Sequence, residues 1–262
     1  MNRINKLFAD SGDKRILSIY YTAGYPTLDS TLTIAETLEK SGADFLEIGF
    51  PYSDPVADGP VIQHSSEVAL RNGMTLHVLF EQLSKLRDRV HIPVLLMGYV
   101  NPVLQYGIDR FCQSCKAVGV DGVIVPDLPM YEYEAQYRAI FEANGLSNIF
   151  LVTPQTSEER IRKIDDLSTS FIYLLSSSAT TGKNLSVSED TAAYFSRIQQ
   201  MKLKNPVVVG FGISNRDTFL RATDYTDGAI VGSAFVRLLD EANYLEKVPA
   251  FIQQLKEVTD GH

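Results

Sequence analysis

Short runs of hydrophobic residues recur along the chain, and each is followed by a longer stretch whose apolar positions have helical spacing. Several runs are almost continuously hydrophobic, which is typical of parallel strands buried on both faces. The pattern predicts eight strands, over residues 16–22, 44–50, 93–99, 121–127, 148–154, 171–177, 206–212 and 228–234. The clearest amphipathic stretches predict helices over 28–40, 75–89 and 132–145.

Eight strands that alternate with helices have the count of a closed (β/α)8 barrel, or TIM barrel, an α/β fold. We expect an extra helix before the first strand. Three strands are approached through an aspartate, in SGADFLEIG, VGVDGVIVPD and YTDGAIVGS, which forms a weak internal repeat. No proline- or serine-rich linker divides the 262 residues, so we expect a single domain over 1–262.

The composition excludes several classes of protein. A net charge of −8 without a basic stripe argues against binding to nucleic acid. Cys112 and Cys115 are the two cysteines, and their surroundings predict ordinary packing in an amphipathic helix rather than a redox or metal site. Neither a signal peptide nor a membrane-spanning run is apparent, so we expect a cytoplasmic protein with no membrane contact.

The stretch LEIGFPYSDPVADGP (46–60) carries three carboxylates at the end of the second predicted strand. Glu47 should face the barrel interior, either as a structural carboxylate held by hydrogen bonds or as an acid and base with a raised pKa. Asp58 follows in a loop that three prolines constrain. Asp54 could cap a turn or take part in binding.

Two long connections follow strand ends, on the face where barrel enzymes carry their active sites. The connection between the second and third strands is nearly twice the usual length and includes residues 61–73. The connection over 176–190 is polar and contains glycine, a composition that is typical of a mobile lid.

Glycines at the ends of the last two predicted strands indicate a phosphate site. GFGIS (210–214) ends the seventh strand, and Gly232-Ser233 ends the eighth. Glycine lets backbone N–H groups approach an anion, and this architecture commonly binds phosphate in these two loops. The combination therefore predicts a phosphorylated substrate.

Missing residue types narrow the chemistry further. No predicted strand ends in the lysine that a Schiff-base aldolase needs, since Lys183 lies out in a loop. The histidines form no metal-ligand pattern; they are His64, His77, His91 and His262. We therefore expect acid–base chemistry with no metal and no cofactor in this chain. Aromatic residues near strand ends could form a pocket wall or pack in the core: Tyr20, Tyr99, Tyr173 and Phe211.

The stretch LEIGFPYSDPVADGPVIQ (46–63) closely resembles the signature of the tryptophan synthase alpha subunit family. Further motifs occur in the order and spacing of that family: YYTAGYP, MGYVNPV, VIVPDLP, TTG, GFGIS and GS. The resemblance covers essentially the whole chain. It implies a lyase of tryptophan biosynthesis that cleaves indole-3-glycerol phosphate to indole and glyceraldehyde 3-phosphate.

The resemblance also implies a partner. The indole would pass by substrate channelling to a tryptophan synthase beta chain, which holds pyridoxal phosphate, within an α2β2 heterotetramer. Pro51 and Asp54 would face that partner.

Residue roles follow from the same resemblance. Glu47 corresponds to the group that protonates C3 of the indole and then accepts the glycerol hydroxyl proton. Asp58 corresponds to the carboxylate that accepts a hydrogen bond from the indole N–H. The remaining predicted contacts are Tyr20 and Met97 in the indole pocket, Tyr99 and Tyr173 against the substrate, Thr181 in the lid, and Gly182, Phe211, Gly212, Gly232 and Ser233 at the phosphate.

Some positions depart from the family pattern. Ser177 stands where an arginine is frequent, Ala179-Thr180 replaces Gly-Val, and Tyr20 replaces a phenylalanine. Two other functions are compatible with the residues: another phosphate-binding barrel enzyme such as an isomerase, and a catalytically weak subunit that gates a partner enzyme.

Overall fold

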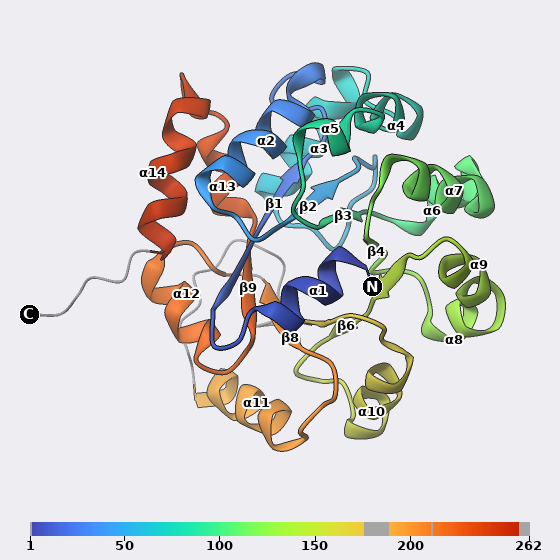
Figure 1. The fold of residues 1–262 in the computed structure, drawn as a ribbon, viewed down its shortest axis with the longest axis vertical. Helices are drawn as coiled ribbons and strands as arrows, with labels where there is room; N and C mark the ends of the chain where they lie inside the picture. The colour runs from blue at the N-terminus through green and yellow to red at the C-terminus, as the bar shows by residue number, and fades with distance from the viewer. Residues whose placement is uncertain (1, 176–188, 211, 257–262) are drawn as a thin grey trace, which may run out of the picture.

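Every strand of the protein runs parallel to its neighbours, and the helices surround the strands (Figure 1). The computed structural model describes residues 2–175, 189–210 and 212–256. The strands are β1 (Ile16–Thr22), β2 (Phe45–Gly49), β3 (Val94–Met97), β4 (Gly122–Ile124), β5 (Ser147–Ile149), β6 (Leu151–Val152), β7 (Ile172–Leu175), β8 (Val207–Gly210) and β9 (Gly228–Val231).

The strands form a barrel, as predicted, in the order β5-β4-β3-β2-β1-β9-β8-β7-β6. The described residues form nine strands rather than the predicted eight, because the stretch 148–154 is divided at Phe150. Residues before Phe150 pair with β4, whereas those after it pair with β7. The two ends of the sheet are therefore consecutive in the chain, and this change of partner closes the ring.

The helices also follow the hydrophobic pattern. Those between β1 and β5 are η1 (Leu28–Ser30), α2 (Thr31–Ser41), α3 (Pro60–Arg71), α4 (Leu76–Leu83), α5 (Leu86–Arg89), α6 (Val100–Tyr106), α7 (Ile108–Val118), α8 (Met130–Glu132), η2 (Tyr133–Tyr137) and α9 (Arg138–Ala143). Those after β6 are α10 (Glu158–Leu167), α11 (Glu189–Gln200), α12 (Arg216–Thr223), α13 (Ser233–Leu238) and α14 (Tyr244–Lys256).

Three predicted helices differ from the prediction in detail. The stretch 28–40 is a 3₁₀ turn that continues into α2, and 75–89 divides into α4 and α5. The stretch 132–145 begins in α8, passes through the π-helical turn η2 and continues as α9. Cys112 and Cys115 are buried on α7 as free thiols, which confirms the prediction of ordinary helical packing.

The predicted N-terminal helix is α1 (Arg3–Asp10), which lies across the middle of the ring of strands (Figure 1). Ile4 is fully buried among the residues that fill the barrel interior. The ring of Phe8 packs against Phe171 and Phe45 at centroid distances of 5.7 and 6.5 Å. Since Phe45 and Phe171 lie at the beginning of strands, α1 closes the N-terminal end of the barrel.

The aspartates of the weak repeat connect neighbouring strands. The buried carboxylates of Asp44 and Asp121 accept hydrogen bonds from the backbone N–H groups of Leu17 (2.8 Å) and Val94 (2.9 Å). Asp227 accepts in the same way from the first N–H of β8, at 2.7 Å. In each case the aspartate precedes one strand and accepts from the strand before it. These hydrogen bonds therefore hold neighbouring strands together at the N-terminal end of the barrel. The C-terminal end, where barrel enzymes carry their active sites, does not contain them.

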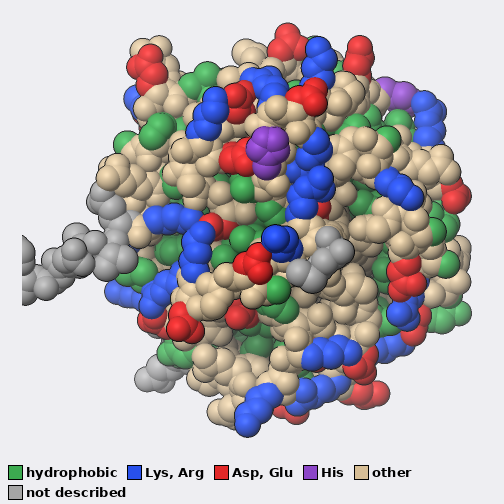
Figure 2. Space-filling model, in the orientation of Figure 1, with side chains coloured by type: hydrophobic (Ala, Val, Ile, Leu, Met, Phe, Trp, Pro, Cys, Tyr) green, Lys and Arg blue, Asp and Glu red, His purple; other side chains and the backbone are tan. Residues whose placement is uncertain are grey.

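The surface around α1 carries mixed charge. Lysine and arginine side chains are interspersed with aspartate and glutamate on this face, with no single basic patch (Figure 2). No helix among the described residues is both long enough and apolar enough to cross a membrane.

Candidate active site

Glu47 lies on β2, inside the barrel and fully buried. Alternate residues of a barrel strand point inward, so Glu47 shares the interior with Phe45 below it and Gly49 above it. Among the described residues neither carboxyl oxygen has a hydrogen-bond partner. Burial raises the pKa of Glu47 to about 8. Glu47 is therefore protonated at neutral pH and is not held by the hydrogen bonds that a structural carboxylate would need.

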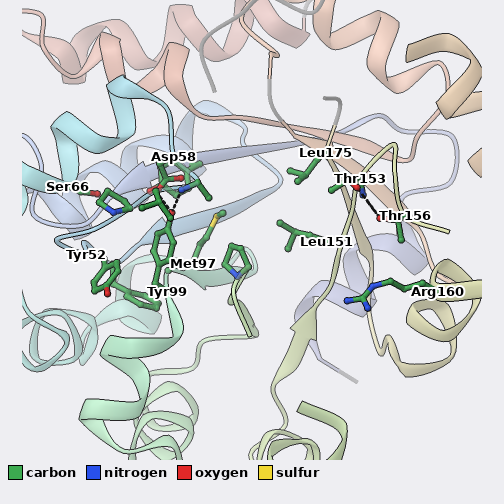
Figure 3. Close-up of a pocket in the computed structure, with 17 residues that line it drawn as sticks. Tyr52, Asp58, Ser66, Met97, Tyr99, Leu151, Thr153, Thr156, Arg160 and Leu175 are labelled. Atoms are coloured by element: carbon green, nitrogen blue, oxygen red, sulfur yellow. Dashed lines mark hydrogen bonds between the residues drawn. The ribbon is translucent and has the colours of Figure 1, made fainter. Parts of the chain in front are cut away.

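A cavity of about 580 Å³ opens at the C-terminal ends of the strands (Figure 3), and Glu47 is not among the residues that line it. Residues from β1, β3 and the loop after β2 form one side of it. Residues from β6, β7 and the start of α10 form the other side. The predicted site residues among those that line it are Tyr20, Asp58, Met97 and Tyr99.

Asp58 is the carboxylate that lines this cavity. Burial raises its pKa to about 6, although a hydrogen bond from Tyr99 opposes that change. The Tyr99 hydroxyl donates to Asp58 Oδ2 at 3.3 Å and accepts from the backbone N–H of Ala57 at 3.0 Å. Tyr99 therefore holds the loop and its carboxylate against the cavity wall, and Asp58 is mostly ionised at neutral pH.

Tyr20 lies within electrostatic reach of both carboxyl groups. It lies beside Glu47 in the register of β1 and β2. Its hydroxyl occupies space that only a glycine leaves free, because a Cβ on Gly49 would lie 2.2 Å from it. Burial raises the pKa of Tyr20, and the charges of Asp58 and Glu47 raise it further. Tyr20 therefore lines the cavity together with Asp58, whereas Glu47, its neighbour in the register, is buried in the barrel interior.

Tyr173 is buried in the barrel interior on β7 rather than at the cavity surface. Its ring projects over Gly210, where a Cβ would lie 2.0 Å from the Tyr173 hydroxyl. Burial raises the pKa of Tyr173, and the charge of Glu47 adds to the effect. Tyr173 therefore lies within electrostatic reach of Glu47.

Three of the predicted phosphate residues lie among the described residues, and none of the three lines this cavity. Gly212 follows β8 with a φ of +77°, a conformation that favours glycine. Gly232 follows β9, and Ser233 begins α13. Thr181, Gly182, Phe211 and residues 176–188 of the predicted lid lie outside the described residues, and residues 189–190 of that lid begin α11.

The two predicted partner-facing residues differ in exposure. Pro51 is buried, whereas Asp54 is exposed. The Ser53 hydroxyl donates to Asp54 Oδ2, and the Asp54 carbonyl accepts from Val56 N–H at 2.9 Å. The Asp54 carboxylate therefore stands in a tight turn at the surface and remains outside the cavity.

The sequence did not single out several residues that line the cavity, namely Tyr52, Leu151, Thr153, Thr156, Arg160 and Leu175. A signal for Thr153, Thr156 and Arg160 was present, because the stretch TPQTSEER lies at the end of the fifth predicted strand and any strand-end loop faces the same end of the barrel. No group of three histidine, cysteine or acidic side chains that could hold a metal occurs among the described residues.

The raised pKa of Glu47 has a consequence for stability. A carboxyl group with an ordinary pKa of 4.5 when unfolded and about 8 when folded binds its proton more tightly in the folded chain. Its contribution to the free energy of unfolding is therefore fully present below pH 4.5 and falls by about 1.4 kcal/mol per pH unit up to the folded pKa.

We expect Glu47→Gln to remove this dependence. The free energy of unfolding of the variant, relative to the unmutated chain, should increase between pH 5 and pH 8 by an amount on the order of a few kcal/mol. Urea denaturation at each pH measures the difference. A difference that stays constant over this range would show that Glu47 is not a buried protonated acid.

Comparison with known proteins identifies the family to which this chain is similar. The family model described as tryptophan synthase alpha chain matches residues 8–260. A tryptophan synthase alpha chain from Christiangramia forsetii is 52% identical over 259 residues, which are 99% of this chain and 100% of that protein. One from Flavobacterium psychrophilum is 52% identical over 255 residues, 97% of this chain and 100% of that protein.

Solved structures agree with the sequence matches. Tryptophan synthase subunit alpha from Legionella pneumophila superposes with a TM-score of 0.89 at 35% identity, covering 97% of both chains. A chain of Mycobacterium tuberculosis tryptophan synthase gives 0.88 at 33% identity, covering 97% of this chain and 96% of that one. These matches do not favour a different phosphate-binding barrel enzyme. The chain belongs to the tryptophan synthase alpha chain family.

Proposed function

We propose that Glu47 and Asp58 carry out the reaction of this family, the cleavage of indole-3-glycerol phosphate to indole and glyceraldehyde 3-phosphate. The chain is a lyase of L-tryptophan biosynthesis. The observation that supports the assignment is that the two carboxyl groups have different environments and therefore different pKa values. Glu47 has a pKa of about 8 with no hydrogen-bond partner among the described residues, and Asp58 has a pKa of about 6 at the cavity wall.

The first chemical step needs an acid. The protonated Glu47 carboxyl would give its proton to C3 of the indole, which makes that carbon tetrahedral and moves positive charge onto the ring nitrogen. The ionised Asp58 carboxylate would accept a hydrogen bond from the ring N–H and stabilise this charge. Each group is in the protonation state that its task requires at neutral pH.

The second step needs a base. Glu47 can serve as this base because it became a carboxylate when it gave its proton to C3. Its carboxylate would remove the proton from the glycerol hydroxyl next to the indole. The oxygen forms the carbonyl of the aldehyde, and the carbon–carbon bond breaks. The electron pair of that bond returns to the ring and neutralises the positive nitrogen. Indole and glyceraldehyde 3-phosphate are released, and Glu47 is again protonated.

The remaining contacts extend the proposal around the substrate. The indole would lie among Tyr20, Met97, Tyr99 and Tyr173, of which the first three line the cavity with Asp58. The phosphate would bind to backbone groups of the loops after β8 and β9, where Gly212, Gly232 and Ser233 lie, together with Gly182 and Phe211. Thr181 would close over Asp58.

We also propose the partner that the family implies, a tryptophan synthase beta chain that holds pyridoxal phosphate, in an α2β2 assembly that channels indole. Support comes from a relative in the tryptophan synthase complex from Pyrococcus furiosus, with a TM-score of 0.83 at 34% identity over 92% of this chain and 97% of that one. Pro51 and Asp54 would face the partner. A single domain and a cytoplasmic location stay predictions from the sequence.

Tyr99 provides a test of how Asp58 works. Tyr99→Phe removes the hydrogen bond that opposes the rise in the pKa of Asp58. The pKa of Asp58 should therefore increase, and a smaller fraction should be ionised near pH 6. We expect kcat/KM to fall more at pH 6 than at pH 8, so that the acidic limb of the pH profile moves to higher pH.

Tyr52→Phe is the matched control for this variant. The Tyr52 ring packs against Tyr99 in a tilted arrangement, with a centroid distance of 5.1 Å, and lines the same cavity, so the control also removes a hydroxyl from the same wall. The control should leave the acidic limb in place. A Tyr99→Phe profile that is lowered equally at all pH values would mean that the Tyr99 hydroxyl does not tune Asp58.

The proposal as a whole is tested by incubating the purified chain with indole-3-glycerol phosphate. Indole and glyceraldehyde 3-phosphate should appear in equal amounts. A chain that binds the substrate without releasing indole, even beside a beta chain, would instead be a subunit that gates its partner.

A further inference from the structure

Two charged side chains line the cavity among the described residues, and they lie on opposite sides of it. Asp58 lies on the side formed by β1, β3 and the loop after β2, and Arg160 reaches the cavity from α10 (Figure 3). Between them the wall consists of apolar and uncharged polar side chains, including Met97, Leu151 and Thr153. The cavity is therefore negative at one end and positive at the other.

The guanidinium of Arg160 has no hydrogen bond or ion pair to another described residue, although two acidic residues precede it in the chain. Its backbone N–H donates to the side chain of Ser157, the N-cap of α10, at 3.3 Å. Arg160 is exposed at the mouth of the cavity. Its charge is consequently available to a molecule that approaches from solvent.

Arg160 does not stabilise its own helix. It occupies the first turn of α10, where the helix dipole favours acidic side chains and disfavours a cation. Glu158 and Glu159 in the same turn have the charge that the dipole favours. A positive side chain at this position is therefore explained better by what the cavity binds than by the local fold.

We infer that Arg160 recruits the phosphate group of the substrate at the mouth of the cavity. This inference rests on the proposed function, which gives the substrate a ring N–H at one end and a phosphate at the other. Asp58 suits the ring N–H, and Arg160 would attract the phosphate at the mouth before the phosphate reaches the loops after β8 and β9. Because the whole chain carries a net charge of −8, a phosphorylated molecule is repelled at long range, and a local cation at the mouth offsets that repulsion.

Arg160→Gln tests the inference, with Arg162→Gln as its matched control. Arg162 lies on the same helix and its loss changes the net charge equally, but it does not line the cavity. We expect Arg160→Gln to lower kcat/KM for indole-3-glycerol phosphate about three- to tenfold at low ionic strength, through KM. The loss should shrink as sodium chloride is added. Arg160→Lys should retain most of the activity.

A binding measurement separates this inference from the proposed function. Calorimetric titration with glycerol 3-phosphate should show a dissociation constant raised about three- to tenfold in Arg160→Gln, whereas the affinity for uncharged indole should stay unchanged. This comparison holds even for a chain that releases no indole. Equal behaviour of Arg160→Gln and Arg162→Gln in the titration would overturn the inference, as would a loss that does not depend on salt.

Discussion

Glu47→Gln should lower the rate of indole formation by about 10²- to 10⁴-fold, because the reaction loses the group that both gives and accepts a proton. Glutamine has nearly the same shape as protonated glutamic acid and cannot transfer a proton to carbon. The cavity should stay intact, so the affinity for the substrate should change little. The loss is therefore expected in kcat rather than in KM.

Three measurements make this result interpretable. Steady-state kinetics give kcat and KM, calorimetry with indole reports the pocket, and circular dichroism reports the fold. Glu81→Gln, on the exposed face of α4, controls for the loss of a carboxyl group. Turnover of Glu47→Gln within about tenfold of the unmutated chain would remove Glu47 from the mechanism.

Asp58→Asn should reduce kcat by about 10²- to 10³-fold, corresponding to roughly 3–4 kcal/mol of transition-state stabilisation. Asparagine can still accept a hydrogen bond from Tyr99, so the loop should keep its position. It lacks the negative charge that stabilises the ring nitrogen as positive charge develops there. The effect should be large because burial beside Tyr20 and Met97 shields this charge from water.

The pH profile distinguishes a loss of charge from a loss of structure. The unmutated chain should lose activity as pH falls through about 6, where Asp58 becomes protonated. The residual activity of Asp58→Asn should lack that acidic limb. Asp88→Asn, which removes an exposed carboxylate of α5, should keep both the rate and the limb. If Asp58→Asn kept the full acidic limb, that limb would have to be assigned to another ionisable group.

Much of this arrangement could be predicted from the sequence, since the signals were local. Continuous hydrophobic runs gave the strands of the barrel, and the strand-end position of Glu47 put it inside near the active end. The division of the fifth strand at Phe150 had no such signal. It depends on which strands lie on either side in the closed ring, and pairing between distant segments leaves little trace in a hydrophobic pattern.

The burial of Glu47 and the position of Arg160 show a second limit of prediction from the sequence. The sequence could not show that Glu47 would have no hydrogen-bond partner, because that depends on every neighbouring strand at once. Arg160 follows a different strand from Asp58, and only closure of the barrel puts the two on opposite sides of one cavity. The aspartate repeat was visible, but its hydrogen bonds to neighbouring strands, such as Asp121 to Val94, were not.

The measurement that tests the central claim most directly is a solvent-exchange experiment. The purified chain is incubated in deuterium oxide with indole, which carries hydrogen at C3, and glyceraldehyde 3-phosphate is added or left out. If Glu47 transfers a proton to and from C3, the unmutated chain should place deuterium at that carbon and Glu47→Gln should not. Equal exchange by both chains would contradict the account, because some other group would then be moving the proton.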